Sequence, residues 1–222
     1  MQIDKISAEQ IPVPMLHALY ARAKESKREN HYIYDQKAME AVERLDYDFA
    51  GEAKDVYMGN GAIARTILLD KMVKEYVQAN PDACIVNVAC GMDTRFYRVD
   101  NGRIRWYDLD LPEVAEVRKR IFGGQERVTM IAKSVLDESW AEEVDAGGPV
   151  LFIIEELSMY LDKQKVEKIF RIIGKYFRRA EVLIEVTAPY TVKNAVKKTE
   201  EGTVPKYTWG IKNGRQIQRL AA

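Results

Sequence analysis

The chain has 222 residues, of which 47% are hydrophobic and 31% charged, so it is long enough to fold around a core. Its 34 Lys and Arg residues balance its 34 Asp and Glu residues, and the formal net charge is zero. This balance excludes a polyanion-binding protein with a uniformly basic surface, so we expect no nucleic-acid partner, and it excludes an acidic disordered chain.

Membrane, secretion and metal signals are absent from the pattern. No apolar run reaches the ~18 residues that would suggest a membrane span, and the start MQIDKISAEQ has no apolar signal-peptide core. We therefore expect a cytoplasmic protein without a membrane partner. Cys84 and Cys90 would lie roughly 20 Å apart on one strand, which is beyond disulfide reach. Together with His17 and His31 they form no zinc-ligand spacing, so we expect no metal.

The first 80 residues predict helices, which we interpret as an amino-terminal helical cap over residues 1–80. Apolar residues recur at helical spacing from Met15 to Ala23, and a weaker pattern covers residues 36–47. A third pattern ends at Asn80-Pro81. Its expected buried face consists of Ile63, Ile67, Val73, Tyr76 and Val77.

From residue 81 to residue 222 the pattern alternates between strands and helices. The five expected strands are Ile85–Ala89, Ile104–Leu109, Val128–Val135, Val150–Glu156 and Val182–Thr187. One helix runs from Pro112 to about Phe122, and another is capped by Asp162. This alternation predicts an α/β domain with a doubly wound, mostly parallel sheet.

Ligands bind such sheets beyond the carboxyl ends of the strands. The first strand ends in the small-residue turn Ala89-Cys90-Gly91, and Asp110 follows the second strand, 19 residues after Gly91. An acid about 20 residues beyond a glycine turn is placed to bind ribose hydroxyls. The alternatives are an ordinary turn glycine and an aspartate that caps the next helix.

Two more charged positions are candidates. Glu155 and Glu156 end the fourth strand, and because adjacent strand residues face opposite ways, at most one can point into a given site. A carboxylate beside a buried strand needs a partner or a ligand. Arg65 lies in the apolar stretch IARTILLDKMV, where a solvated side chain is the alternative.

Three motifs, VNVACGMDTRFYR, RWYDLDLPEVAEVRKR and FIIEELSMYL, resemble the leucine carboxyl methyltransferase family. This group of S-adenosylmethionine-dependent O-methyltransferases includes polyketide-tailoring carboxyl methyltransferases. LYARAKESKR and GAIARTILLD are similar to its amino-terminal helices, so the resemblance runs from about residue 14 to residue 220. It implies a Rossmann-like methyltransferase fold and S-adenosylmethionine as cofactor.

The resemblance also assigns cofactor-binding roles. Arg65 matches the arginine that pairs with the methionine carboxylate, Gly91 the turn beneath it, and Asp110 the ribose-binding acid. Ser134 and Val135 match the adenine contacts, Glu155 the acid near the amino group, and Lys24 a lysine that reaches the cofactor or substrate. Ala89 stands where the family turn has its first glycine, which is tolerable if its φ is ordinary. Glu156 stands where the family often has a small residue.

The cofactor supplies the reactive methyl group, so the protein mainly aligns the reactants and excludes water. A carboxylate of a small-molecule acceptor is ionised at neutral pH and needs no base, whereas a phenol or alcohol needs one. No histidine follows His31, which favours a carboxylate acceptor, although an acidic residue or an amino-terminal histidine could serve as base. Tyr160 is the candidate catalytic residue on the acceptor side, and a packing aromatic is the alternative.

Two other functions remain as alternatives. One is an inactive, truncated relative that acts as a binding protein. The other is a nicotinamide-dependent oxidoreductase, which the glycine turn and distal acid would suit, although the G-x-G-x-x-G pattern is absent.

Charge is unevenly distributed near the carboxyl end. Residues 133–162 carry eight acids and one base, whereas residues 190–222 carry seven bases and two acids. After the fifth strand we expect helices at Thr191–Thr199 and Gly214–Leu220, and we find no sixth or seventh strand of the usual methyltransferase sheet. Either the chain is short at this end relative to the family, or another subunit, in a homo-oligomer, covers the exposed edge of the fifth strand.

Overall fold

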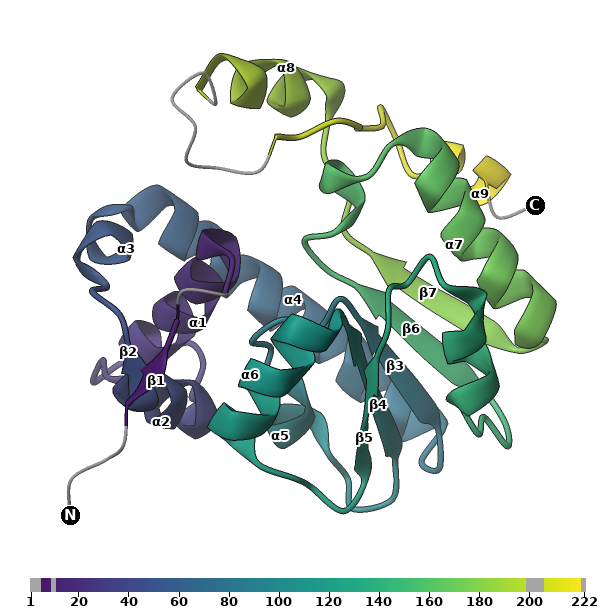
Figure 1. Ribbon diagram of the computed structural model, residues 1–222, viewed down its shortest axis with the longest axis horizontal. Coiled ribbons are helices and arrows are strands. Elements are labelled where there is room, and N and C mark those ends of the chain that lie inside the picture. The colour runs from purple at the N-terminus through teal and green to yellow at the C-terminus, as the bar shows by residue number, and fades with distance from the viewer. Residues whose placement is uncertain (1–4, 9–10, 199–205, 221–222) are drawn as a thin grey trace. The chain divides into compact units, whose positions relative to one another are not determined.

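Figure 1 shows the protein as a computed structural model, which describes residues 5–8, 11–198 and 206–220. The chain divides into two compact units whose segments alternate in sequence. Unit 1 comprises residues 1–82, 91–104 and 111–129, and unit 2 comprises residues 83–90, 105–110 and 130–222. None of the helices in the described ranges is long and apolar enough to span a membrane.

Unit 1 is mainly helical. Its elements are β1 (Ile6–Ser7), α1 (Val13–Ser26), α2 (Gln36–Arg44), β2 (Leu45–Asp46), α3 (Ala50–Lys54), α4 (Val56–Ala79), α5 (Arg95–Val99) and α6 (Pro112–Phe122). The short parallel pair of β1 and β2 was not expected. Helices α1, α2 and α6 share an apolar core that includes Leu19, Ala38 and Val117.

The helices of the predicted cap are confirmed, with one error on α4. Ile63, Val73, Tyr76 and Val77 are buried, but Ile67 is 40% exposed. The buried face instead passes through Thr66, because that position lies three residues after Ile63 and seven before Val73, in step with the helical repeat. Ile67 is therefore turned one position away from the core.

Unit 2 contains most of a five-stranded, mostly parallel sheet, which confirms the predicted fold class. Its strands are β3 (Cys84–Val88), β4 (Arg105–Asp110), β5 (Val128–Ala132), β6 (Val150–Ile154) and β7 (Ala180–Ile184), in the order β5-β4-β3-β6-β7. The pairs β3–β4, β3–β6 and β6–β7 are parallel. β3 and β6 are buried at every residue, as their apolar sequences require.

The strand order contains a switch point between β3 and β6. From β3 the chain moves outward to β4 and β5, then returns to form β6 on the other side of β3. Ligands of open parallel sheets bind at the carboxyl ends of the strands at such a point. The residues that follow β3 and β6 are therefore the first to consider as a site.

The remaining elements of unit 2 follow the strands. They are η1 (Glu138–Glu143), η2 (Ser158–Tyr160), α7 (Lys163–Tyr176), α8 (Pro189–Lys198) and α9 (Arg215–Leu220). α7 begins as predicted, because the Asp162 carboxylate accepts a hydrogen bond from the Lys165 amide (2.8 Å). α7 contributes Ile169 and Ile173 to the core on the sheet, next to Phe152.

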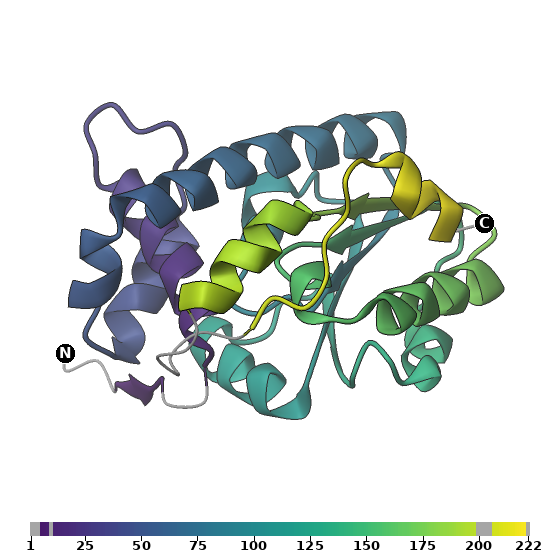
Figure 2. The same cartoon turned by 90° about the horizontal axis from the view of Figure 1, so that it is seen from above.

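The end of the chain follows the predicted helices. The described residues after Ile184 form α8 and α9 and no strand, as Figure 2 shows from above. The labels β6 and β7 denote the fourth and fifth strands of the five-stranded sheet, because β1 and β2 form a separate pair. They are not the sixth and seventh strands of the usual methyltransferase sheet. Residue 199, in the predicted helix Thr191–Thr199, lies outside the described residues.

Three strands end two or three residues earlier than predicted, and β3 ends at Val88 instead of Ala89. β5 ends at Ala132 instead of Val135, because the Ser134 carbonyl accepts a hydrogen bond from the Asp137 amide (2.9 Å) and starts a turn. β6 ends at Ile154 instead of Glu156. β7 covers Ala180–Ile184 instead of 182–187, because its pairing ends with that of β6.

Candidate functional site

The turn after β3 is held by buried arginines within unit 1. Nη1 of Arg118, on α6, donates to the carbonyl oxygens of Gly91 (2.9 Å) and Asp93 (2.7 Å). Nη2 of Arg22, on α1, donates to the carbonyl oxygen of Met92 (2.8 Å). Two guanidinium groups thus donate hydrogen bonds to three consecutive carbonyl oxygens, which holds the backbone of the turn in one conformation.

Gly91 is needed at this turn for two reasons. Its φ is +47°, in the left-handed region that side chains disfavour. A Cβ at this position would also lie 2.9 Å from Sδ and 3.1 Å from Cγ of Met15. The packing of Met15 and the left-handed backbone account for the glycine, and the predicted close approach of a ligand to Gly91 stays a prediction.

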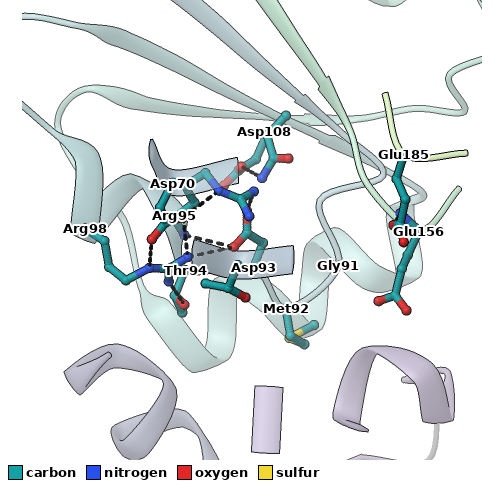
Figure 3. A network of polar contacts seen from close by, with 12 residues as sticks. Asp70, Gly91, Met92, Asp93, Thr94, Arg95, Arg98, Asp108, Glu156 and Glu185 are labelled. Carbon is teal, nitrogen blue, oxygen red and sulfur yellow. Dashed lines mark hydrogen bonds and ion pairs between the residues drawn. The ribbon is translucent and has the colours of Figure 1, made fainter. Parts of the chain in front are cut away.

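The two arginines belong to a larger buried cluster, which we call the arginine–aspartate cluster. Its members are Arg22, Asp35, Asp70, Asp93, Arg95, Arg98 and Arg118. Figure 3 shows Arg95 and Arg98 directed at Asp70 of α4, with Arg95 Nε 2.8 Å and Arg98 Nε 2.6 Å from its carboxylate oxygens. Arg95 Nη1 also lies 2.8 Å from Asp93 Oδ2.

Asp35 ties the cluster to the helices of unit 1. Its Oδ2 lies 3.1 Å from Arg22 Nε and 2.7 Å from Arg98 Nη1. Its Oδ1 accepts a hydrogen bond from the Ala38 amide (2.9 Å), which caps α2. The Asp35 side chain is 1% exposed, so this carboxylate would be costly to bury without these partners.

Charge in the cluster sets the state of Asp93. Burial would raise the pKa of the Asp93 carboxyl, but the guanidinium groups of Arg95 and Arg98 outweigh it and hold that pKa well below its usual range. The carboxylate therefore stays ionised and keeps its partners across the neutral range.

The sequence interpretation of VNVACGMDTRFYR depends on its small residues and does not include the arginine–aspartate cluster. The signal was present in MDTRFYR, which places two arginines three positions apart, and in the acid of IARTILLDKMV. Charged residues in otherwise apolar segments indicate buried pairs, but their partners lie far away in sequence.

Backbone strain marks both sides of the switch point in unit 2. Among the described residues other than glycine, positive φ occurs at Ala89 (+51°), directly after β3, and at Glu156 (+49°), two residues after β6. The condition under which Ala89 would replace the family glycine without cost, an ordinary φ, is therefore not met. Strain of this kind concentrates at functional sites, where the surrounding structure imposes it.

The two aspartates at the end of β4 have different surroundings. The Asp108 Oδ1 atom accepts hydrogen bonds from Trp106 Nε1 (2.8 Å) and from Asn87 Nδ2 (3.4 Å). Asp108 is thereby committed to the sheet. Asp110, the last residue of β4, is 6% exposed at the carboxyl edge, and its predicted contact with ribose stays a prediction.

Ser134 and Val135 lie in the loop that follows β5. The Ser134 Oγ atom accepts a hydrogen bond from the Leu136 amide (3.2 Å), and the Val135 carbonyl accepts one from Trp140 Nε1 (2.9 Å). Both bonds shape this loop at the carboxyl edge of the sheet. Their predicted contacts with adenine stay predictions.

Acidic residues gather after β6 and β7. Glu155 and Glu156 are half-buried, and Figure 3 shows Glu185 beside Glu156. Glu185 Oε2 accepts a hydrogen bond from the Glu156 amide (2.8 Å), and the Glu185 carbonyl accepts one from Ser158 Oγ (2.6 Å). Glu185, which was missed from the sequence, thus holds the strained residue in place.

Arg65 and Lys24 both belong to unit 1. Arg65 is half-buried on α4. Lys24, at the end of α1, is exposed, and its Nζ donates to the Ala53 carbonyl of α3 (3.1 Å). Their predicted roles toward a cofactor stay predictions.

Tyr160 lies at the end of η2, and its ring packs edge-to-face on Tyr207 with 5.3 Å between centroids. Burial, together with the nearby Tyr207 and Glu156, raises the pKa of the Tyr160 hydroxyl well above its usual range. The hydroxyl therefore stays protonated and can donate a hydrogen bond.

Comparison with models of protein families assigns the chain to a family. Residues 15–174 match the family described as leucine carboxyl methyltransferase. The chain belongs to this family. The family match confirms the resemblance drawn from the three sequence motifs.

Two curated relatives of this leucine carboxyl methyltransferase family member are also methyltransferases. The tetracenomycin polyketide synthesis O-methyltransferase TcmP of Streptomyces glaucescens is 29% identical over 92% of this chain and 76% of the relative. The S-adenosyl-L-methionine-dependent methyltransferase dpfgK of Gibberella zeae is 27% identical over the same shares. These matches place the chain among the S-adenosylmethionine-dependent O-methyltransferases and not among the nicotinamide-dependent oxidoreductases.

A solved structure supports the fold. The SAM-dependent methyltransferase of Anabaena variabilis aligns with a TM-score of 0.50 at 12% identity, over 64% of this chain and 63% of that one. The chain thus spans about three quarters of the length of its curated relatives and less than two thirds of this structure.

We expect opposite effects from exchanging glycine and alanine in the turn. Gly91→Ala forces a side chain into the left-handed region against Met15 and should lower the free energy of unfolding by about 1–2 kcal/mol or more. Ala89→Gly relieves the strain at φ +51° and should leave that free energy unchanged or raise it by up to ~1 kcal/mol. Urea unfolding followed by circular dichroism measures both.

Gly59→Ala is the matched control, because an added Cβ on this residue of α4 meets no atom within 4 Å. It should raise the free energy of unfolding by about 0.5–1 kcal/mol. Equal effects of alanine at positions 59 and 91 would contradict the assigned constraint at the turn.

A second prediction concerns acid stability. Because the folded-state pKa of Asp93 is depressed, its contribution is fully present above about pH 4 and is lost as the pH falls toward that lowered pKa. Asp93→Asn should lower the free energy of unfolding at pH 7 by about 3 kcal/mol and flatten its decline at acidic pH. Unfolding midpoints in urea at a series of pH values test this.

Asp82→Asn serves as the control, since the Asp82 carboxylate pairs with Arg103 at the surface and is 71% exposed. We expect a change within about 1 kcal/mol for that variant. An acid decline as steep in Asp93→Asn as in the wild type would show that Asp93 does not carry the pH dependence.

Proposed function

We propose that the protein binds S-adenosylmethionine at the carboxyl edge of β3, β4 and β6 and transfers its methyl group to an oxygen of a small molecule. The observation that carries this proposal is the pair of strained residues, Ala89 and Glu156, on the two strands of the switch point. Family membership supplies the class of chemistry.

The residues present suit the chemistry of this cofactor. Gly91, which the family resemblance places beneath the methionine end of the cofactor, has the left-handed backbone that a glycine turn of this kind requires. Asp110 would accept hydrogen bonds from the ribose hydroxyls. By charge, Glu155 of unit 2 suits the ammonium group of the amino-acid end and Arg65 of unit 1 suits its carboxylate, as the family resemblance implies for each.

When bound, the cofactor supplies an electrophilic methyl group on a sulfonium. The chain's own part is to bind, orient and shield the reactants. The turn at Gly91 is suited to orientation because buried guanidinium groups hold its carbonyl oxygens. Little reorganisation is then required at the moment of reaction.

A carboxylate is the acceptor we propose first. It is already ionised at neutral pH and needs no general base, and the protonated Tyr160 hydroxyl is suited to donate a hydrogen bond rather than to remove a proton. A hydroxyl acceptor is the second candidate, because Glu156 and Glu185 place carboxylates after β6 and β7 that can act as a base.

The cofactor site is tested by Asp110→Asn. Loss of charged hydrogen bonds to ribose should weaken S-adenosylhomocysteine binding by about ten- to a hundredfold, as measured by titration calorimetry. Asp145→Asn, at an 85% exposed side chain of unit 2, should bind as the wild type does.

Unchanged affinity in Asp110→Asn with a native circular dichroism spectrum would refute the ribose role. Absence of S-adenosylhomocysteine binding to the wild type would instead favour the alternative of an inactive relative. That alternative is not tested by family membership.

The two acceptors differ in pH dependence. Methyl transfer from tritiated S-adenosylmethionine to 2-naphthoic acid should be nearly constant from about pH 6 to pH 9, because the acid is ionised throughout. Transfer to 2-naphthol should rise toward pH 9, because a larger fraction of its phenolic hydroxyl is then ionised. Transfer to the naphthol alone would overturn the carboxylate proposal.

A further inference from the structure

After α8 the chain returns to the sheet as an extended segment, residues 206–211, which we call the strap (Figure 2). Its backbone binds the two loops that follow β6 and β7. The Thr208 amide donates to the Met159 carbonyl (2.8 Å), and the Ile211 amide donates to the Thr187 carbonyl (2.9 Å). The strap is therefore fastened across the carboxyl ends of both strands.

A glycine permits this close docking. A Cβ on Gly210 would lie 2.7 Å from the Thr187 carbonyl oxygen and 3.0 Å from Val192 Cγ2. The first of these atoms is backbone and cannot move aside cheaply. The glycine thus lets the backbone of the strap lie directly against the loop after β7, although the strap does not pair with β7 as a strand.

The strap brings aromatic rings to this edge. Tyr207 packs on Tyr160, with 5.3 Å between ring centroids and 73° between ring planes. Trp209 lies between the two backbone anchors, and all three side chains are half-buried. Part of each side chain is therefore accessible at the edge where ligands of parallel sheets bind.

We propose that the strap forms one wall of the acceptor site and that Tyr207, together with Tyr160, selects acceptors that carry a planar aromatic ring. Tyrosine rings offer a rigid surface with little entropy to lose, and aromatic pairs gain beyond the area they bury. This inference rests on the proposed function, because it takes the carboxyl edge as the place where the acceptor binds.

The test compares matched probes that differ only in aromaticity. These are 2-naphthoic acid with decahydro-2-naphthoic acid, and 2-naphthol with decahydro-2-naphthol. Their dissociation constants are measured by calorimetry on the protein saturated with S-adenosylhomocysteine. In at least one pair, we expect the aromatic member to bind roughly three- to tenfold more tightly.

Variants assign the preference to the ring. Tyr207→Ala should abolish it, and Tyr207→Phe should keep it, since the ring remains. Tyr190→Ala is the matched control, because Tyr190 lies on α8 of the same unit with 75% of its surface exposed, and it should keep the preference. Thermal unfolding of each variant separates loss of binding from loss of folding.

Equal affinities within both pairs, or no binding of any probe, would overturn the proposal, as would a preference that persists in folded Tyr207→Ala. If Tyr207→Ala does not fold, Tyr207→Leu replaces it in the test. Loss of the preference in folded Tyr207→Leu supports the proposal, and its persistence overturns it. Failure of S-adenosylhomocysteine to bind would count against the proposed function instead, and the probe pairs would then be measured on the unloaded protein.

Discussion

Two buried guanidinium groups that hold three consecutive carbonyl oxygens are the interaction on which the rest of unit 1 depends. Arg22 and Arg118 come from helices almost a hundred residues apart, and both end on the turn from Gly91 to Asp93. Removing one partner from such a buried set leaves a charge or a carbonyl without compensation, which is more costly than a lost surface pair. The cluster therefore defines the turn and joins α1, α2, α4 and α6 to it.

Strained backbone at Ala89 and Glu156 is a separate feature, which belongs to unit 2. Ala89 and Glu156 adopt left-handed backbone that costs about 1–2 kcal/mol at each residue, and Glu185 holds the amide of Glu156. Strain survives only where surrounding contacts over-determine the backbone. The strained residues follow the two strands of the switch point, at the edge where ligands of open parallel sheets bind.

The described carboxyl-terminal residues lie against the loops at the carboxyl edge of β6 and β7. The described residues after β7 supply two helices and the strap, which is fastened by amides to the loops after β6 and β7. The zero net charge conceals the acidic character of residues 133–162, which contribute Glu155 and Glu156 to the carboxyl edge. β7 ends the sheet in the order of strands, and a second copy of the chain against it stays a prediction.

The sequence by itself determined the element types, the parallel sheet, the glycine turn and the family. These features depend on local signals: buried strands read as apolar runs, Asp162 caps its own helix, and the motifs are contiguous. Only the tertiary structure decided the rest. It showed that Asp108 serves the sheet, that Ala89 and Glu156 are strained, and that Asp35, Asp70 and Asp93 meet the arginines. These properties arise from contacts between residues up to 63 positions apart, and hydrophobic periodicity carries no information about which distant partners will meet.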